Sequence, residues 1–493
     1  MPTPSLVRLS RRACHPCQSR KRRCGKELPE CSLCVRMGRK CDYQNRASVS
    51  KPQDATSPEP VTNHFPASYF LDPLLFSHYN VVLRVPNLPI PQEFLDVTGN
   101  AASVRKFAAR YFVTIHAWFP ILCRPKFYGN LMHQSTHQES DLVLLLVCMR
   151  LLCEPPKSKG YARSPTYCRI KQYFVELESA GVLTVLILQA QLLVAVYELA
   201  HAIYPAGHLT VGACARYGLA LGLHKEGSLW EHSPSRWIDI EERHRAWWAI
   251  LWLDRHLNIS FPRRGLCTEE PAEDWYLPVP DKNWNDGEFP TNPPHRLSAG
   301  LEVEMGIFAR TAQTTHLLGR VLRHVSDTEM DPQFSREERR SLERALQSLL
   351  SLTIDEEKLS TSQYCSPIAL SASALLVLHS HPEADALCAE SRARSLAAME
   401  ALSRVILSFA HQFITGVKFE SDEASPLLLD IMYRSAAVFI TLQRTHVCDE
   451  FRDCEQILIR AMEQLGVGWM ATGVYLELLE ARRLATVQLE IST

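Results

Sequence analysis

Residues 14–41 read CHPCQSRKRRCGKELPECSLCVRMGRKC, and six of the sixteen cysteines in this 493-residue chain lie within them. The spacing C-x2-C-x6-C occurs twice, with six residues between the two copies. A repeated ligand spacing is much harder to obtain by chance than a single C-x2-C pair. Thiolates at short, regular spacings are typical of structural zinc sites. The stretch therefore predicts a small metal-binding module.

The number of cysteines indicates how the metal is shared. A structural zinc ion takes four tetrahedral ligands, so two separate sites would need eight cysteines. Six cysteines fill two sites only if two sulfur atoms bridge both ions. The internal repeat nominates the first cysteine of each copy as the bridges, Cys14 and Cys31. Each ion is then completed by two further cysteines: Cys17 and Cys24 for one, Cys34 and Cys41 for the other.

Two other arrangements of the cysteines compete with this one. A mononuclear site made from the two C-x2-C pairs would leave the third cysteine of each copy without a role, although both stand at the same offset. A disulfide-linked knot needs an oxidising compartment. The residues after Met1 contain no apolar stretch of the kind found in a secretory signal, so we expect a reducing environment. The two-zinc arrangement uses all six cysteines.

A run of basic residues, Arg20–Arg23, stands directly before the third cysteine. We expect a short helix over Gln18–Arg23, held by the metal and sized for the major groove of DNA. Residues 1–46 hold twelve Lys and Arg against three acids, a net charge of +9, whereas the whole chain carries −1. Such a basic head favours a polyanion as partner. A nuclear localisation signal or a merely solvated surface would also account for the run.

The module resembles the fungal Zn2Cys6 binuclear zinc-cluster DNA-binding domain. The likeness includes the cysteine spacing, the basic run, Pro29 two residues before the fourth cysteine, and Tyr43 after the last. Gln18 departs from the family, which usually has Arg there. The resemblance implies that Arg20 and Lys21 contact base edges, commonly those of a CGG triplet. Four other arginines are better suited to phosphate contacts, which position the protein without specifying a sequence: Arg11, Arg12, Arg22 and Arg23.

The chain after the module divides into a linker and a helical body. Residues 47–68 are rich in Ser and Pro without periodicity, which is typical of a flexible linker. Beyond them the apolar residues recur at helical spacing, and no stretch alternates strictly as a half-buried strand does. We therefore expect a mainly α protein, with the zinc module over 1–46 and an all-α domain over 69–493. The linker shows no heptads of a coiled coil, so homodimer formation stays open.

The helical body is similar to the fungal-specific transcription factor domain. The likeness covers roughly residues 105–290 and rests on three segments: Tyr111–Phe127, Gln189–His224 and Arg243–Arg255. It implies a regulatory domain that accompanies the zinc cluster. A small-molecule effector or a co-regulator would then have a site in this bundle. Its tryptophans at helical spacing, Trp247, Trp248 and Trp252, are expected to be core residues.

Two further expectations concern the later helices. Asp254 and Arg255 are expected to pair with Arg243 or Arg245 in a network on the helix surface, which would contribute little to stability. One continuous helix is expected over Arg452–Ala485. The longest apolar stretch, Val182–Ala200, includes Gln and Glu residues and is too polar to span a membrane.

A search for catalytic motifs finds no phosphate-binding loop, no dinucleotide fingerprint, no H-E-x-x-H and no nucleophile elbow. A zinc site made only of cysteines has no open coordination position and is therefore structural. The sequence thus predicts a nuclear transcription regulator that is not an enzyme and that binds double-stranded DNA through a module held by two zinc ions. The alternative is a helical metabolite-binding protein or enzyme whose zinc module targets it to chromatin.

Overall fold

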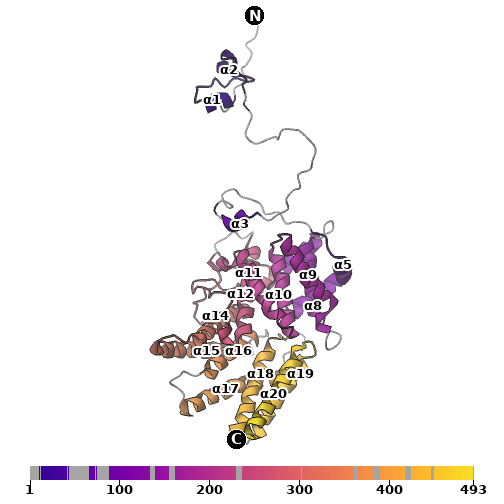
Figure 1. Ribbon diagram of the computed structural model, residues 1–493, viewed down its shortest axis with the longest axis vertical. Coiled ribbons are helices and arrows are strands. Elements are labelled where there is room, and N and C mark those ends of the chain that lie inside the picture. The colour runs from indigo at the N-terminus through magenta and orange to yellow at the C-terminus, as the bar shows by residue number, and fades with distance from the viewer. Residues whose placement is uncertain are drawn as a thin grey trace. The chain divides into compact units, whose positions relative to one another are not determined.

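The computed structural model describes these residues: 10, 13–41, 43, 66–72, 74, 88–133, 139–154, 161–228, 236–300, 302–359, 365–381, 389–416, 424–445 and 449–491. The chain forms two compact units, residues 1–62 and 63–493, and each is described by itself (Figure 1). The described residues of the first unit form two short helices, α1 (His15–Ser19) and α2 (Ser32–Arg36).

In its described residues the second unit is built from α-helices and a few 3-10 turns. The α-helices of its described ranges are α3 (Ser68–Leu71), α5 (Gln92–Thr98), α6 (Ala101–Val113), α7 (Arg124–His133), α8 (Ser140–Cys153), α9 (Pro165–Ser179), α10 (Val185–Ala200), α11 (Ala206–Ala220), α12 (Trp237–Asn258), α13 (Asp281–Asp286), α14 (Ile307–Ser326), α15 (Pro332–Leu359), α16 (Cys365–Ser380), α17 (Ala389–Ile414), α18 (Leu428–Thr445), α19 (Asp449–Leu465) and α20 (Ala471–Ile491). These ranges contain no strand, only an isolated antiparallel bridge. The predicted mainly α fold is confirmed.

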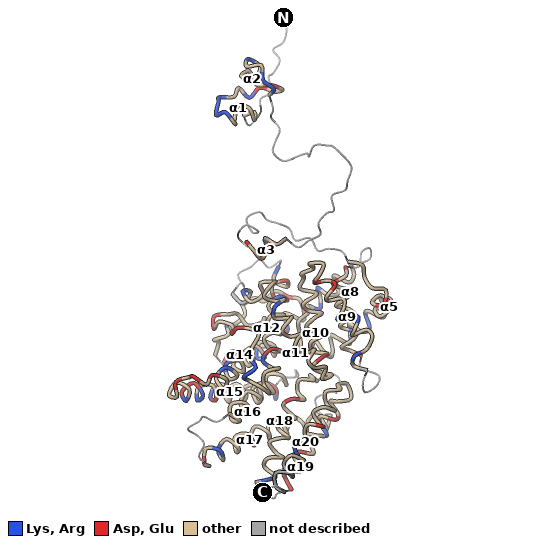
Figure 2. The backbone as a smooth tube through the Cα atoms, viewed as in Figure 1, with Lys and Arg blue, Asp and Glu red and all other residues tan. Residues whose placement is uncertain are grey.

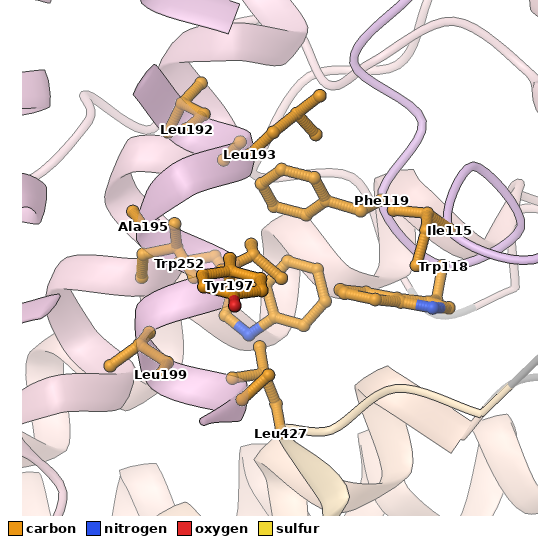
Figure 3. Packing of buried hydrophobic residues seen from close by; sticks show 14 of the residues in the cluster. Ile115, Trp118, Phe119, Leu192, Leu193, Ala195, Tyr197, Leu199, Trp252 and Leu427 are labelled. Carbon is orange, nitrogen blue, oxygen red and sulfur yellow. The ribbon is translucent and has the colours of Figure 1, made fainter. Parts of the chain in front are cut away.

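The core of this unit lies where α8, α10 and α12 pack against their neighbours. α10 is buried nearly all round, as its predominantly apolar sequence predicts. Its first turn is fixed by Thr184, whose Oγ1 accepts a hydrogen bond from the Ile187 amide at 3.2 Å. Trp252 of α12 packs edge-on against Trp118, with ring centroids 6.4 Å apart (Figure 3). The prediction that Trp247, Trp248 and Trp252 are core residues is confirmed, since each is at most 3% exposed.

Asp254 and Arg255 of α12 are buried, so the expected surface network is wrong. Arg255 is fully buried and donates to Glu270 at 2.8 Å. Asp254 is 2% exposed, and its carboxylate accepts from the backbone amides of Cys267 and Thr268 at 3.0 Å. The irregular segment that follows α12 folds back over its polar side. That segment supplies the hydrogen-bond partners that make burial of the charges tolerable.

The region expected as one helix over Arg452–Ala485 forms two, α19 and α20. Gly466 lies at the break, and a Cβ there would meet the Thr472 side chain at 2.6 Å. This close approach of the chain to itself requires glycine and ends α19. Of the helices in the described ranges, none is both long and apolar enough to cross a membrane.

Candidate metal centre

The six cysteines of the first unit converge through α1, α2 and the segments that follow each helix. Their sulfur atoms form two groups of four, and within each group all sulfurs lie within 4.8 Å of one another. Both groups contain Cys14 and Cys31. Two further sulfurs complete each group: Cys17 and Cys24 in one, Cys34 and Cys41 in the other. The structure thus brings together all the cysteines singled out from the spacing.

The distances between these sulfurs suit tetrahedral zinc. Zn–S bonds of about 2.3 Å place the sulfurs of one tetrahedron about 3.8 Å apart. The Sγ atom of Cys14 lies 3.6 Å from that of Cys31 and 3.7 Å from that of Cys24. The Sγ atoms of Cys17 and Cys31 are 3.7 Å apart. Because Cys24 and Cys41 belong to these groups, they are not the idle residues that a mononuclear site would leave.

Burial of the sulfurs argues for a cation among them. Cys14 and Cys31 are fully buried, whereas Cys24 and Cys41 are partly exposed. Burial raises the pKa of the Cys14 thiol, so its thiolate needs a positive charge close by. A divalent ion supplies that charge and deprotonates its coordinating thiols. The donor set therefore fits zinc. In the described part of this unit the buried cluster consists of cysteines, so a hydrophobic core of ordinary size is missing there.

The two helices of the module have the same hydrogen-bond pattern, displaced by seventeen residues. The Gln18 amide donates to the Cys14 carbonyl at 3.0 Å, and the Val35 amide donates to the Cys31 carbonyl at 3.1 Å. In α1 the ring of Pro16 occupies the first turn, where its missing N–H costs nothing. Each C-x2-C pair therefore spans the start of a helix, which holds its two sulfurs on one side.

Each helix also ends in the same way. The Arg22 amide donates to the Cys17 carbonyl at 2.9 Å, and the Arg39 amide donates to the Cys34 carbonyl at 3.0 Å. These six-residue closures are Schellman motifs, which place the residue before the closing amide in the left-handed region. Gly38 occupies that position after α2 with φ +58°. Lys21 occupies it after α1 with φ +50°, although a side chain is disfavoured there.

The expected helix over Gln18–Arg23 is wrong, because α1 starts at His15 and ends at Ser19. Pro16 sets the start of the helix, and the Schellman closure ends it before the basic run. Arg20–Arg23 instead form the turn and extended segment between α1 and Cys24, and all four are exposed. Figure 2 shows this run in blue beside α1. Arg11 and Arg12, the other two arginines assigned to phosphate, lie outside the described residues.

The geometry adds features that sequence reasoning missed. The sequence contained the signal for these features, because each residue in one copy of the cysteine repeat can be compared with the residue at the same position in the other copy. Arg22 corresponds to Arg39, and both are exposed next to a buried cysteine pair. Arg20 and Lys21 have no basic counterparts, because Met37 and Gly38 stand in their places. A cationic pair at the end of the helix is therefore a property of the first copy alone.

Each of the two units matches the model of a known protein family. A model of the fungal Zn(2)-Cys(6) binuclear cluster domain matches residues 12–50. A model of the fungal specific transcription factor domain matches residues 108–351.

Individual proteins also match. Transcription factor BOA15 of Botryotinia fuckeliana is 34% identical over 180 residues, which are 36% of this chain and 99% of that protein. The pigment biosynthesis transcriptional activator pigB of Monascus ruber is 23% identical over 321 residues, and the match covers 56% of each chain. Among solved structures, the K. lactis CBF3 core matches 85% of this chain and 88% of its own, with 13% identity and a TM-score of 0.45.

Proposed function

We propose that this chain, which belongs to the family of fungal Zn(2)-Cys(6) binuclear cluster transcription factors, reads a G-rich, CGG-like half-site in the major groove. The family is one of transcription regulators that bind DNA through a zinc module, and not of enzymes. In this proposal Arg20 and Lys21 read the bases, and the six cysteines of the module hold the metal.

The observation that carries the assignment is the fixed presentation of Arg20 and Lys21. Both side chains are exposed, while the backbone on either side of them is tied to the cysteine cluster. The Arg22 amide is bonded to the Cys17 carbonyl, and Cys24 Sγ lies 3.7 Å from Cys14 Sγ. A short, rigid segment loses little conformational freedom on binding, so its cations can discriminate between base pairs. Arg and Lys favour the O6 and N7 acceptors of guanine.

In this proposal two zinc ions hold the segment. Cys14 and Cys31 bridge the ions, and the other four cysteines each bind one ion. Two Zn²⁺ with six thiolates carry a net −2, which the surrounding cations balance. Metal binding supplies the folding free energy that so small a core lacks. Arg22 and Arg23 contact phosphates and fix the register, and we extend this role to Arg11 and Arg12.

Selection of bound sequences from random DNA tests the proposal directly. The full chain, purified with zinc, should enrich duplexes that share a CGG-like triplet. Enrichment of sites without a common G-rich triplet would contradict the assignment. The same experiment reports the oligomeric state, because a monomer selects one triplet and a homodimer selects two at a fixed spacing.

We also propose that the protein acts in the nucleus on a set of metabolic or secondary-metabolite genes. The basic run in the module is of the kind that nuclear import recognises, and the relative from Monascus ruber is named as an activator of pigment biosynthesis. A fluorescent fusion in the native fungus and transcript profiling after deletion of the gene test these two points. Cytoplasmic retention, or an unchanged set of biosynthetic transcripts, would contradict them. The alternative, a metabolite-binding body that carries a targeting module, predicts a ligand for the second unit.

A further inference from the structure

The second unit contains a cavity of about 360 Å³ between the end of α6, the start of α7 and the helices α13 and α14. This volume is in the range of small-molecule sites in proteins. Three aromatic side chains line it, Phe112, Trp118 and Phe308, and all three are buried. Planar rings packed around one cavity favour a flat, apolar ligand body.

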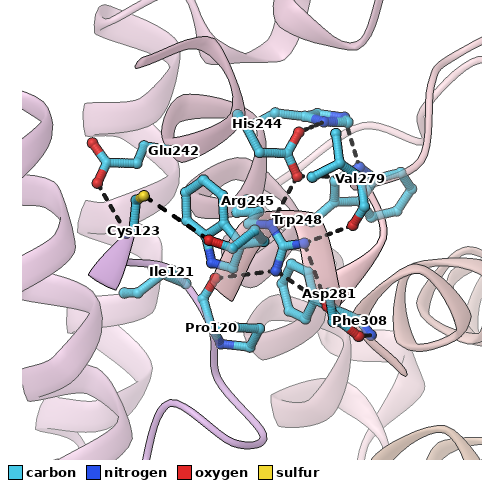
Figure 4. Close-up of polar contacts among 12 residues, drawn as sticks. Pro120, Ile121, Cys123, Glu242, His244, Arg245, Trp248, Val279, Asp281 and Phe308 are labelled. Atoms are coloured by element: carbon cyan, nitrogen blue, oxygen red, sulfur yellow. Dashed lines mark hydrogen bonds and ion pairs between the residues drawn. The ribbon is translucent and has the colours of Figure 1, made fainter. Parts of the chain in front are cut away.

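Among the described residues, the one carboxylate in the cavity wall, that of Asp281, already has partners within the protein. Asp281 Oδ1 lies 3.3 Å from Nη2 of Arg245, and its Oδ2 accepts from the Phe308 amide at 3.3 Å. That amide belongs to the first turn of α14, which favours negative charge. Arg245 is fully buried and also donates to Glu241 at 2.7 Å. Its Nη2 donates to the Val279 carbonyl at 2.8 Å (Figure 4). Asp281 therefore serves to join α12, α13 and α14.

The histidine in the wall carries no charge near neutral pH. His116 is 5% exposed, and its Nε2 lies 2.9 Å from Oδ1 of Asn285. Burial lowers the pKa of His116 to about 4. The ring thus adds polar character to the cavity without adding a cation.

The remaining charge at the cavity is Arg124, the first residue of α7. Its side chain is exposed, and it forms no hydrogen bond or ion pair with the described residues. A free guanidinium at the mouth of an aromatic cavity is a ready partner for a carboxylate, which it can bind through two parallel hydrogen bonds.

We propose that this cavity is an effector site for a small planar aromatic carboxylate, with the ring between the aromatic walls and the carboxylate on Arg124. The ligand would contact the segment that follows α6 and the helices α13 and α14 at once. It would thereby stabilise the second unit, because a ligand that binds only the folded state raises its unfolding free energy. The site does not depend on which DNA sequence the zinc module reads.

Calorimetric titration of the full chain tests the site with two matched probes, 2-naphthoate and the uncharged 2-naphthamide. We expect 2-naphthoate to bind about tenfold or more tightly than 2-naphthamide. The Arg124→Gln variant should remove that preference, and its fold should be unaffected because the side chain has no partner in the described structure. The control, Arg105→Gln, changes an exposed arginine of α6 outside the cavity lining and should bind both probes as the parent does.

Three results would overturn the effector site: no binding of 2-naphthoate, equal binding of the two probes, or a preference that survives Arg124→Gln. The last result would place the carboxylate elsewhere, for example on the basic module. DNA affinity measured on the same preparations keeps the two proposals apart. A variant that loses the naphthoate preference but binds its DNA normally affects the effector site alone.

Discussion

In the first half of the cysteine module, α1 ends at Ser19 and Lys21 takes the left-handed backbone; in the second half, α2 ends at Arg36 and Gly38 takes it. The hydrogen bonds that close the two helices are the same. Glycine tolerates this conformation freely, whereas a lysine there costs about 1 kcal/mol. In the proposed arrangement the cysteines of both halves bind metal, so the lysine is best explained by a task that the second half does not have.

The largest expected effect tests whether the halves are joined by shared sulfurs. Cys31→Ser removes a ligand from both groups, whereas Cys41→Ser removes a ligand from one. We expect native mass spectrometry of the full chain to find neither zinc ion in the Cys31→Ser variant. The Cys41→Ser variant should keep the ion whose four ligands are intact. Equal zinc loss in the two variants would show that Cys31 is not shared between the two ions.

The second prediction distinguishes sequence-specific base contacts from non-specific phosphate contacts. Lys21→Ala should weaken binding to the selected site at least tenfold while affecting a scrambled duplex far less, since good base contacts contribute about 1–3 kcal/mol of discrimination. Arg39→Ala, in the other half, should weaken both duplexes by similar small factors, as loss of a phosphate contact does. Fluorescence anisotropy at one fixed salt concentration measures both variants. If Lys21→Ala weakens the two duplexes equally, Lys21 does not read bases.

The smallest expected effect concerns the backbone. Lys21→Gly should stabilise the zinc-loaded module by about 1 kcal/mol, because it relieves a disfavoured conformation. Gly38→Ala should destabilise it by a similar amount, and the cost is conformational, since a Cβ at Gly38 meets no atom within 4 Å. Competition with a zinc chelator measures both changes, because folding and metal binding are coupled. If Lys21→Gly is neutral, the strain assigned to the first half is absent.

The sequence predicted the helical class and the grouping of cysteines well because both depend on local spacing. The basic helix over Gln18–Arg23 was misplaced, since Pro16 and the closure at Lys21 set its limits. That closure is visible only when the two copies are compared residue by residue. The break at Gly466 was missed for a similar reason, because it depends on contact with Thr472.

Burial of charge was the hardest feature to predict. Asp254 and Arg255 are charged residues of the kind found on the solvent-exposed face of a helix. Nothing in the neighbouring sequence indicates that they are buried. Their partners, Thr268 and Glu270, come from an irregular segment without periodicity. The cavity beside Phe308 was likewise beyond sequence reasoning, since its walls come from segments far apart in the chain.

The unequal burial of the proposed zinc ligands has a consequence for oxidative damage. Oxidation of a cysteine depends on access to its sulfur as well as on its thiolate character. Cys24 and Cys41, which each serve one ion in the proposed arrangement, are the more accessible sulfurs, while Cys14 and Cys31 are fully shielded. A mild oxidant would therefore attack ligands of a single ion first. The sulfurs whose modification would release both ions at once would be the last it reaches.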